Sequence, residues 1–219
     1  KDMLLQILTE LRDEIRAGTP VVGLEPSCVS VFRDEMCDLI RGNEDAKRLK
    51  KQTFTLAEFL EKKAPDFKIP QLKRNAIVQA HCHHKAIMKI DSEEKLLKKI
   101  GLDYQVLDSG CCGMAGYFGY LKGDKYEVSI KAGERVLLPA VRGADSTTLV
   151  ISNGYSCREQ IEQLTDREGM HIAQVLQMAL HENGKSQENA EAFPERKYVD
   201  GMKLHSAALT AKRAAVIVS

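Results

Sequence analysis

The chain has 219 residues, of which 43% are hydrophobic and 29% are charged, as in an ordinary globular protein that can bury a core. Lysine and arginine together number 32 against 31 aspartates and glutamates, and this near-neutral balance argues against a nucleic-acid partner. No apolar run approaches the roughly 20 residues of a membrane helix, so we expect no transmembrane segment.

Helical and strand patterns alternate along the chain. Apolar residues recur at helical spacing over 3–17, and Thr55-Leu56-Ala57-Glu58 is a capping box that predicts a helix over 56–63. The alternation predicts an α/β fold with a largely parallel sheet. Short apolar runs predict strands at 21–24, 76–80, 104–107 and 148–151, and further helices are expected over 29–41, 84–100, 125–138, 170–182 and 203–217.

Each predicted strand leads to cysteine. Cys28, Cys82 and Cys157 follow the first, second and fourth strands, and the third ends at the adjacent pair Cys111 and Cys112. Because the carboxyl ends of parallel strands meet at one edge of a sheet, we expect these loops to gather there. Adjacent cysteines rarely form a disulfide with each other, since the ring distorts the peptide, and two ligands for one soft metal centre are favoured instead.

Thiolate is a soft ligand that selects zinc, copper(I) or iron–sulfur clusters. Cys82, Cys111, Cys112 and Cys157 supply four thiolates, enough for a cubane cluster or a Cys₄ zinc site. Cys28 is a fifth candidate ligand. It either remains from a separate first site or joins the other four. Six cysteines in a chain of this size and composition favour metal or redox use over a disulfide scaffold, so we expect a cytoplasmic protein, with association at the inner-membrane surface left open.

Residues beside the cysteines are candidates for cofactor contacts. Gly113 follows the adjacent pair, and glycine lets the backbone approach a cluster closely and adopt positive φ. His83 follows Cys82 and is expected to direct an N–H at a sulfur or carbonyl, which would tune the redox potential. Direct zinc ligation by His81 or His84 stays open, although an extended backbone there would prevent all three histidines from reaching one ion.

A weak internal repeat predicts two related halves. Residues 21–28 align without gaps with 150–157, and both read as strand, small turn, Ser-Cys and helix. No cysteines equivalent to Cys82, Cys111 and Cys112 precede Cys28 in this sequence, and the first residue, Lys1, already lies within a helical pattern. We therefore expect a fragment that begins partway through the first repeat, with 1–65 as its remainder and 66–219 as the second repeat with a C-terminal extension.

At these residues the sequence resembles the cysteine-rich CCG domain family, which includes heterodisulfide reductase B subunits. The family motif is a cysteine, then Cys-Cys-Gly, then Cys-x-x-Cys, usually present twice. Here the second copy looks like Cys82, Cys111-Cys112-Gly113 and Cys157, and residues 24–35 look closest to the C-terminal iron–sulfur region of FAD-linked 2-hydroxyacid dehydrogenases. The last motif reads Gly-Tyr-Ser-Cys, so one thiolate is missing and a five-thiolate cluster is not expected.

The resemblance implies an electron-transfer module that carries an iron–sulfur cluster, most simply of the 4Fe-4S type. Its electrons would come from an FAD domain upstream in the same polypeptide, reduced by a 2-hydroxy acid such as lactate, glycolate or 2-hydroxyglutarate. They would pass to a quinone or another acceptor, and this fragment alone would not oxidise substrate. Two alternatives remain: a structural zinc scaffold or interaction domain without redox activity, and adjacent thiols that act as a dithiol.

Overall fold

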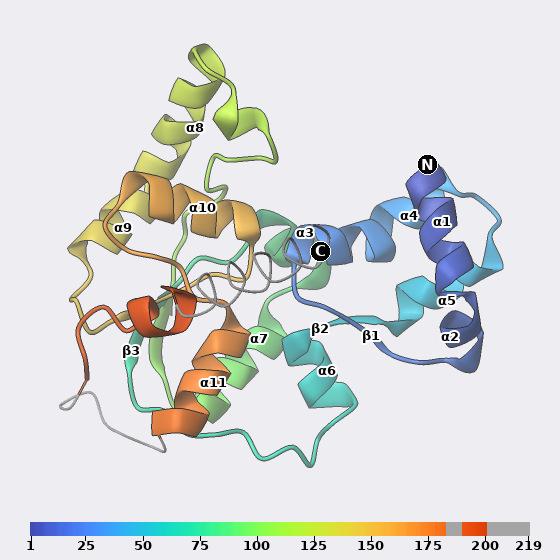
Figure 1. Ribbon diagram of the computed structural model, residues 1–219, viewed down its shortest axis with the longest axis horizontal. Helices are drawn as coiled ribbons and strands as arrows, with labels where there is room; N and C mark the ends of the chain where they lie inside the picture. The colour runs from blue at the N-terminus through green and yellow to red at the C-terminus, as the bar shows by residue number, and fades with distance from the viewer. Residues whose placement is uncertain (183–189, 201–219) are drawn as a thin grey trace, which may run out of the picture. The chain divides into compact units, whose positions relative to one another are not determined.

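A computed structural model describes residues 1–182 and 190–200, which form two compact units (Figure 1). The first unit comprises residues 1–68 and 80–98, and the second comprises 69–79 and the described residues from 99 onward. Both contain helices and parallel strands, so the predicted α/β class is confirmed. Within the described ranges, no helix has the length and apolar character needed to cross a membrane.

The second unit is built on a three-stranded parallel sheet. Its central strand is β3 (Asn75–Val78), which pairs with β4 (Asp103–Val106) on one side and β5 (Leu149–Ile151) on the other. Val78 is therefore opposite both Val106 and Ile151, and the three strands end at the same edge. The helices of this unit are η3 (Phe118–Tyr120), α8 (Asp124–Glu134), α9 (Leu137–Gly143), α10 (Tyr155–Leu164), α11 (Ile172–Glu182) and η5 (Arg196–Asp200).

Two cysteines belong to the core of the second unit. Cys112 and Cys157 are 3% and 1% exposed and pack in one apolar cluster. Burial of this apolar surface is the main force that holds the loop after β4 and helix α10 together. The other members of the cluster are Leu107, Met114, Leu137, Val141, Val150 and Ile161.

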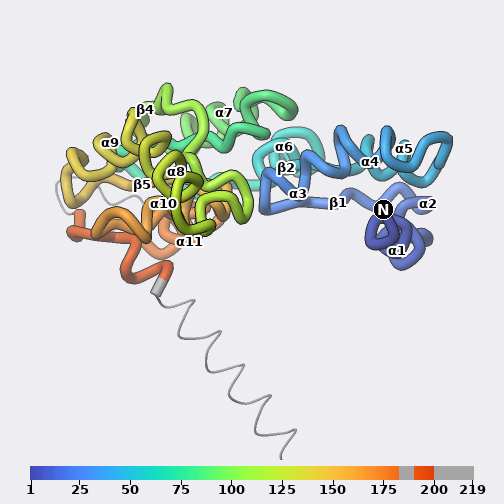
Figure 2. Tube along the Cα trace, turned by 90° about the horizontal axis from the view of Figure 1, so that it is seen from above, coloured from blue at the N-terminus to red at the C-terminus, as the bar shows by residue number. Residues whose placement is uncertain are grey.

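The first unit has a smaller sheet in which β1 (Val21–Gly23) and β2 (Thr53–Thr55) pair in parallel. Helices α2 and α4 pack against α5 around a second apolar core, and Figure 2 shows these elements side by side. The helices are α1 (Asp2–Glu10), α2 (Arg12–Ala17), α3 (Pro26–Ser30), η1 (Val31–Glu35), α4 (Met36–Leu39), α5 (Glu44–Gln52), α6 (Leu56–Lys62), η2 (His84–Met88) and α7 (Asp91–Ile100), whose last turn belongs to the second unit.

The capping box is confirmed: Thr55 Oγ1 accepts from the Glu58 N–H at 3.3 Å, and Glu58 Oε2 accepts from the Thr55 N–H at 3.0 Å. Several predicted helices are broken. The helix expected over 84–100 is interrupted because Lys89 adopts a φ of 65°, which separates η2 from α7. The helices expected over 3–17 and 125–138 are likewise divided, whereas the one expected over 29–41 is continuous through α3, η1 and α4, with a π-helical middle segment. The helix expected over 203–217 lies outside the described residues.

The expectation that all four cysteine-bearing strands share one edge is wrong for β1. This strand pairs with β2, a strand that sequence reasoning missed, and lies in a separate sheet from β3, β4 and β5. Three residues, Thr-Phe-Thr, are too few to show the alternation that marks a strand. The division into repeats at residue 65 stays a prediction, because a compact unit is not in itself evidence of duplication.

Candidate functional site

The candidate site starts from the carboxyl edge of the three-stranded sheet. The backbone N–H of Gln79 donates to the Ile151 carbonyl at 2.8 Å, and the N–H of Leu107 donates to the Val78 carbonyl at 2.9 Å. Ser109, just before the adjacent cysteines, donates its hydroxyl to Gln79 Oε1. Among the residues that the structure describes, the buried Nε2 atom of Gln79 has no hydrogen-bond partner.

Three thiols gather beyond this edge. The side chains of Cys111 and Cys157 both hydrogen-bond to that of Cys112 and, together with burial, raise the pKa of Cys112 far above its usual range. All six cysteines lie in the described ranges, and all are free thiols. The fold thus brings together three of the five metal ligands proposed from the sequence.

Gly113 shapes the loop that carries two of these thiols. Its φ is +100°, and its N–H donates to Cys111 Sγ at 3.3 Å. A Cβ atom at this position would lie 2.1 Å from the Ser129 carbonyl oxygen of α8, so only glycine fits without a backbone shift. The predicted close approach therefore exists, but it is to the backbone of helix α8.

Two side chains join α10, the helix that carries Cys157, to neighbouring segments, and sequence reasoning missed both. Arg158 Nη1 donates to the carbonyl oxygens of Ser152 and Asn153 at 3.1 and 2.7 Å, which satisfies the turn between β5 and α10. Gln160 Nε2 donates to the Ser129 carbonyl at 3.1 Å and joins α10 to α8. The only available sequence signal was their position directly after Cys157.

The donor set fits a soft metal centre. Cys112 interacts with Cys111 from its own loop and with Cys157 from helix α10, and Cys112 and Cys157 are buried. Neighbouring thiols and burial raise the pKa of Cys112, so its thiol holds its proton unless a cation replaces it. Zinc and iron–sulfur clusters both bind thiolates in this way.

A second group of potential ligands lies in the first unit. The ligand atoms of His81, Cys82 and His83 all lie within 4.8 Å of one another. The backbone at His83 is helical, with φ −65° and ψ −34°, whereas the sequence argument against shared ligation assumed an extended chain. These three side chains are buried, half-buried and exposed in turn, so a metal would reach them from the side of His83.

His84 lies apart from that group and is buried. Its Nδ1 atom is 3.2 Å from Glu93 Oε2, and both side chains are less than 5% exposed. Burial lowers the pKa of His84 to about 4; Glu58 opposes this shift, while His81 and Arg33 reinforce it. His84 is therefore neutral at pH 7 and donates from Nδ1 to Glu93, which leaves Nε2 as its one possible ligand atom, and ligation by His84 stays a prediction.

Acid should destabilise the first unit through His84. In the unfolded state His84 binds a proton as pH falls through its ordinary pKa of 6.5. In the folded state it binds that proton only near pH 4. Stability should thus be lost progressively between these values, by about 3 kcal/mol at most. Urea unfolding followed over this range should show a steeper pH dependence than in His84→Gln, and parallel curves for the two proteins would contradict this role.

Cys28 lies in α3 of the first unit and is exposed. Burial of its sulfur, and secondarily the charge of Glu25, raise the pKa of its thiol. Ligation by Cys28 stays a prediction.

His171 caps α11, because its Nδ1 atom accepts from the Ala173 N–H at 3.0 Å.

Comparison with known proteins finds relatives among dehydrogenases. The chain is 30% identical over 168 residues to one subunit of the anaerobic glycerol-3-phosphate dehydrogenase of Escherichia coli K12, a match that covers 74% of this chain and 41% of the relative. It is 28% identical over 170 residues to D-2-hydroxyglutarate dehydrogenase of Pseudomonas putida, covering 77% of this chain and 16% of the relative. The Haemophilus influenzae protein of the same name is 25% identical over 178 residues, with 74% and 16% covered.

The chain thus spans less than half the length of each of these relatives. No family model matches it, and no solved structure matches it.

Proposed function

We propose that this chain is the cluster-binding, electron-transfer module of a larger FAD-linked oxidoreductase that acts on 2-hydroxy acids. The observation that carries the proposal is the interaction of Cys112 with both Cys111 and Cys157, in the segments that follow the carboxyl ends of β4 and β5. A bound iron–sulfur cluster, of the 4Fe-4S type, would supply one-electron redox chemistry there. The chain itself would hold the cluster, exclude water and set the potential.

Cys82 is proposed as the fourth ligand because of its place in the chain. It follows Gln79 by three residues, and Gln79 is hydrogen-bonded to Ile151 and Ser109 at the same sheet edge. Cys28 is kept as a less favoured ligand, because it follows a strand of the other sheet.

Polar contacts around the sulfur atoms would tune the proposed cluster. The Gly113 N–H already donates to Cys111 Sγ, and such hydrogen bonds stabilise the more negative, reduced state. His83 is proposed to act in the same way beside Cys82. Cys112 and Cys157 are buried, so the local dielectric constant is low and each of these hydrogen bonds is electrostatically stronger.

The relatives support the substrate class and the need for partners. Two are named D-2-hydroxyglutarate dehydrogenase, and another is named as a subunit of a glycerol-3-phosphate dehydrogenase. We therefore propose a flavin domain, in the same polypeptide, as the electron donor and a quinone or another carrier as the acceptor. The fragment alone is expected to be inactive toward substrate, and the two-repeat division at residue 65 belongs to this proposal.

A structural zinc site is the second candidate function. It is favoured by the proximity of the ligand atoms of His81, Cys82 and His83, a mixed nitrogen and sulfur set that suits zinc. In that case the chain would be a scaffold or an interaction domain, and zinc removal would unfold it.

Metal content after oxygen-free purification and reconstitution separates the two functions. The proposed module should be brown and contain about four iron and four sulfide per chain. Elemental analysis, sulfide determination and the visible absorption spectrum are the measurements. A colourless, iron-free protein that retains one zinc would overturn the redox proposal and establish the zinc site.

A further inference from the structure

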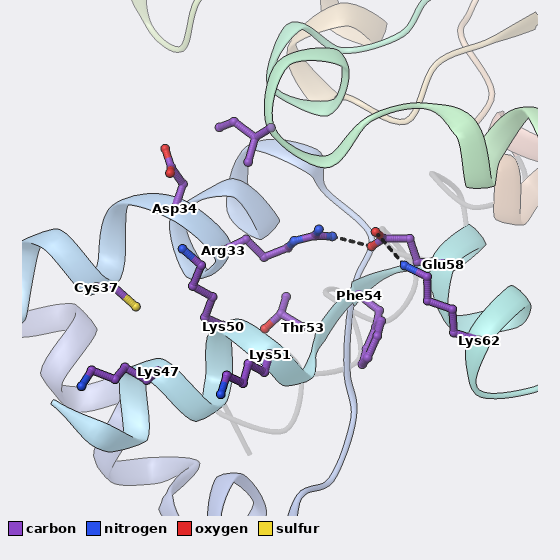
Figure 3. A pocket seen from close by; sticks show the side chains of 11 residues that line it. Arg33, Asp34, Cys37, Lys47, Lys50, Lys51, Thr53, Phe54, Glu58 and Lys62 are labelled. Atoms are coloured by element: carbon purple, nitrogen blue, oxygen red, sulfur yellow. Dashed lines mark hydrogen bonds and ion pairs between the residues drawn. The ribbon is translucent and has the colours of Figure 1, made fainter.

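A second concave site lies in the first unit, in a region that the cysteine chemistry does not use. A cavity of about 780 Å³ opens among η1, α4, α5, β2, α6 and η2, as Figure 3 shows. This volume falls in the range of small-molecule sites, which is roughly 300 to 1,000 Å³. The cavity is formed entirely by residues of that unit.

Positive charge dominates the lining of this cavity. Five of the lining side chains are cationic and two are acidic, so an anion is the favoured occupant. The cationic residues are Arg33, Lys47, Lys50, Lys51 and Lys62, and the acidic residues are Asp34 and Glu58.

Glu58 already pairs with two of these cations, Arg33 and Lys62, so it does not neutralise the remaining three. Arg33 Nη1 lies 2.5 Å from Glu58 Oε2, and Lys62 Nζ lies 3.6 Å from Glu58 Oε1. Figure 3 shows the two cations approaching the carboxylate from different elements. Glu58 also accepts from the Thr55 N–H, so its oxygens are occupied and it acts as a fixed part of the wall.

The surplus is concentrated on α5. Lys47, Lys50 and Lys51 are spaced three and four apart and therefore share one face of the helix, from which all three extend in Figure 3. Lys47 pairs with the exposed Glu44 at 2.7 Å, whereas Lys50 and Lys51 have no ion-pair partner within residues 1–182 and 190–200.

Like charges at these spacings repel one another. A helix C-terminus favours cations, which accounts for lysines in the last turn of α5. It does not account for their position beside two further cations, Arg33 of η1 and Lys62 of α6, around the same cavity.

We propose that this cavity binds a small multivalent anion, an organic phosphate or a polycarboxylate, through Lys50 and Lys51. The half-buried ring of Phe54 provides an apolar wall for the carbon part of such a ligand. The concave shape favours a small molecule over an extended acidic peptide. This site is independent of the proposed cluster and is testable whether or not a cluster is bound.

Calorimetric titration of the full chain with pyrophosphate and with citrate, at low ionic strength, tests the proposal. One or both anions should bind saturably with a dissociation constant below about 1 mM. The anion with the lower dissociation constant shows whether the site prefers phosphate or carboxylate groups. In Lys50→Gln/Lys51→Gln the affinity should fall at least about tenfold, because two unpaired cations facing the cavity are lost.

The matched control is Arg48→Gln/Lys68→Gln, which removes the same charge from exposed positions outside the cavity. Its affinity should stay within about twofold of the parent chain. An equal loss in the control variant would show non-specific attraction and overturn the site. Saturable binding of an oligo-aspartate peptide without binding of either small anion would also overturn it, in favour of a docking surface.

Discussion

Replacing Cys112 by serine should lower the iron and sulfide content of the anaerobically reconstituted chain by more than about tenfold. Cys112 is the sulfur that contacts both Cys111 and Cys157, and it is 3% exposed. A serine hydroxyl keeps the volume of the site but is a hard, weak ligand for cluster metals. Iron and sulfide assays, read together with the visible spectrum, measure the effect.

Two variants make this prediction specific. Cys37→Ser alters a half-buried cysteine that packs against the core of the first unit, and it should retain the parent iron content. Cys82→Ser tests the proposed fourth ligand and should lose iron as Cys112→Ser does. Circular dichroism and urea unfolding should show that all three variants fold. Parent-like iron in a folded Cys112→Ser protein would exclude the three-thiol group as the cluster site.

Gly113→Ala should destabilise the second unit by about 4 kcal/mol, a large effect for one methyl group. The φ of +100° is strained for any residue with a Cβ, and that Cβ would lie 2.1 Å from the Ser129 carbonyl oxygen. Relief would require the loop after β4 to move away from α8, which would also displace Cys111 and Cys112. The urea midpoint and the reconstituted iron content should therefore fall together.

Gly116→Ala is the control that separates the two causes. Gly116 also has positive φ, +67°, but a Cβ there would meet no atom within 4 Å. Only the backbone strain applies, so we expect a cost of about 1 kcal/mol and unchanged iron content. Similar losses of stability in the two variants would show that contact with α8 does not constrain Gly113.

The central part of the fold could be predicted because its signals are local. The apolar runs at 76–80, 104–107 and 148–151 match β3, β4 and β5 to within two residues, and the clearest is that of the fully buried β5, as expected for a buried parallel strand. The capping box depends only on residues three apart and was also found. Breaks within helices, such as the positive φ of Lys89, leave the apolar periodicity intact and were missed.

The candidate site shows the same division. Adjacent cysteines after one strand and a cysteine after the next are recognisable as potential soft ligands in the sequence, because ligand chemistry belongs to the residue type. The buried Gln79–Ser109 contact, the Arg158 contacts to the β5 turn and the cationic cavity join residues from different segments. No pattern within a single segment reports such contacts.

The sequence by itself determined the fold class, the strands of the larger sheet and the chemical character of the thiols. Only the tertiary structure decided that β1 pairs with β2 in another sheet, and that Cys112 interacts with both Cys111 and Cys157. The physical reason is that strand partners and side-chain contacts depend on how distant segments bury their apolar surfaces together. Local propensity and periodicity carry no information about that choice.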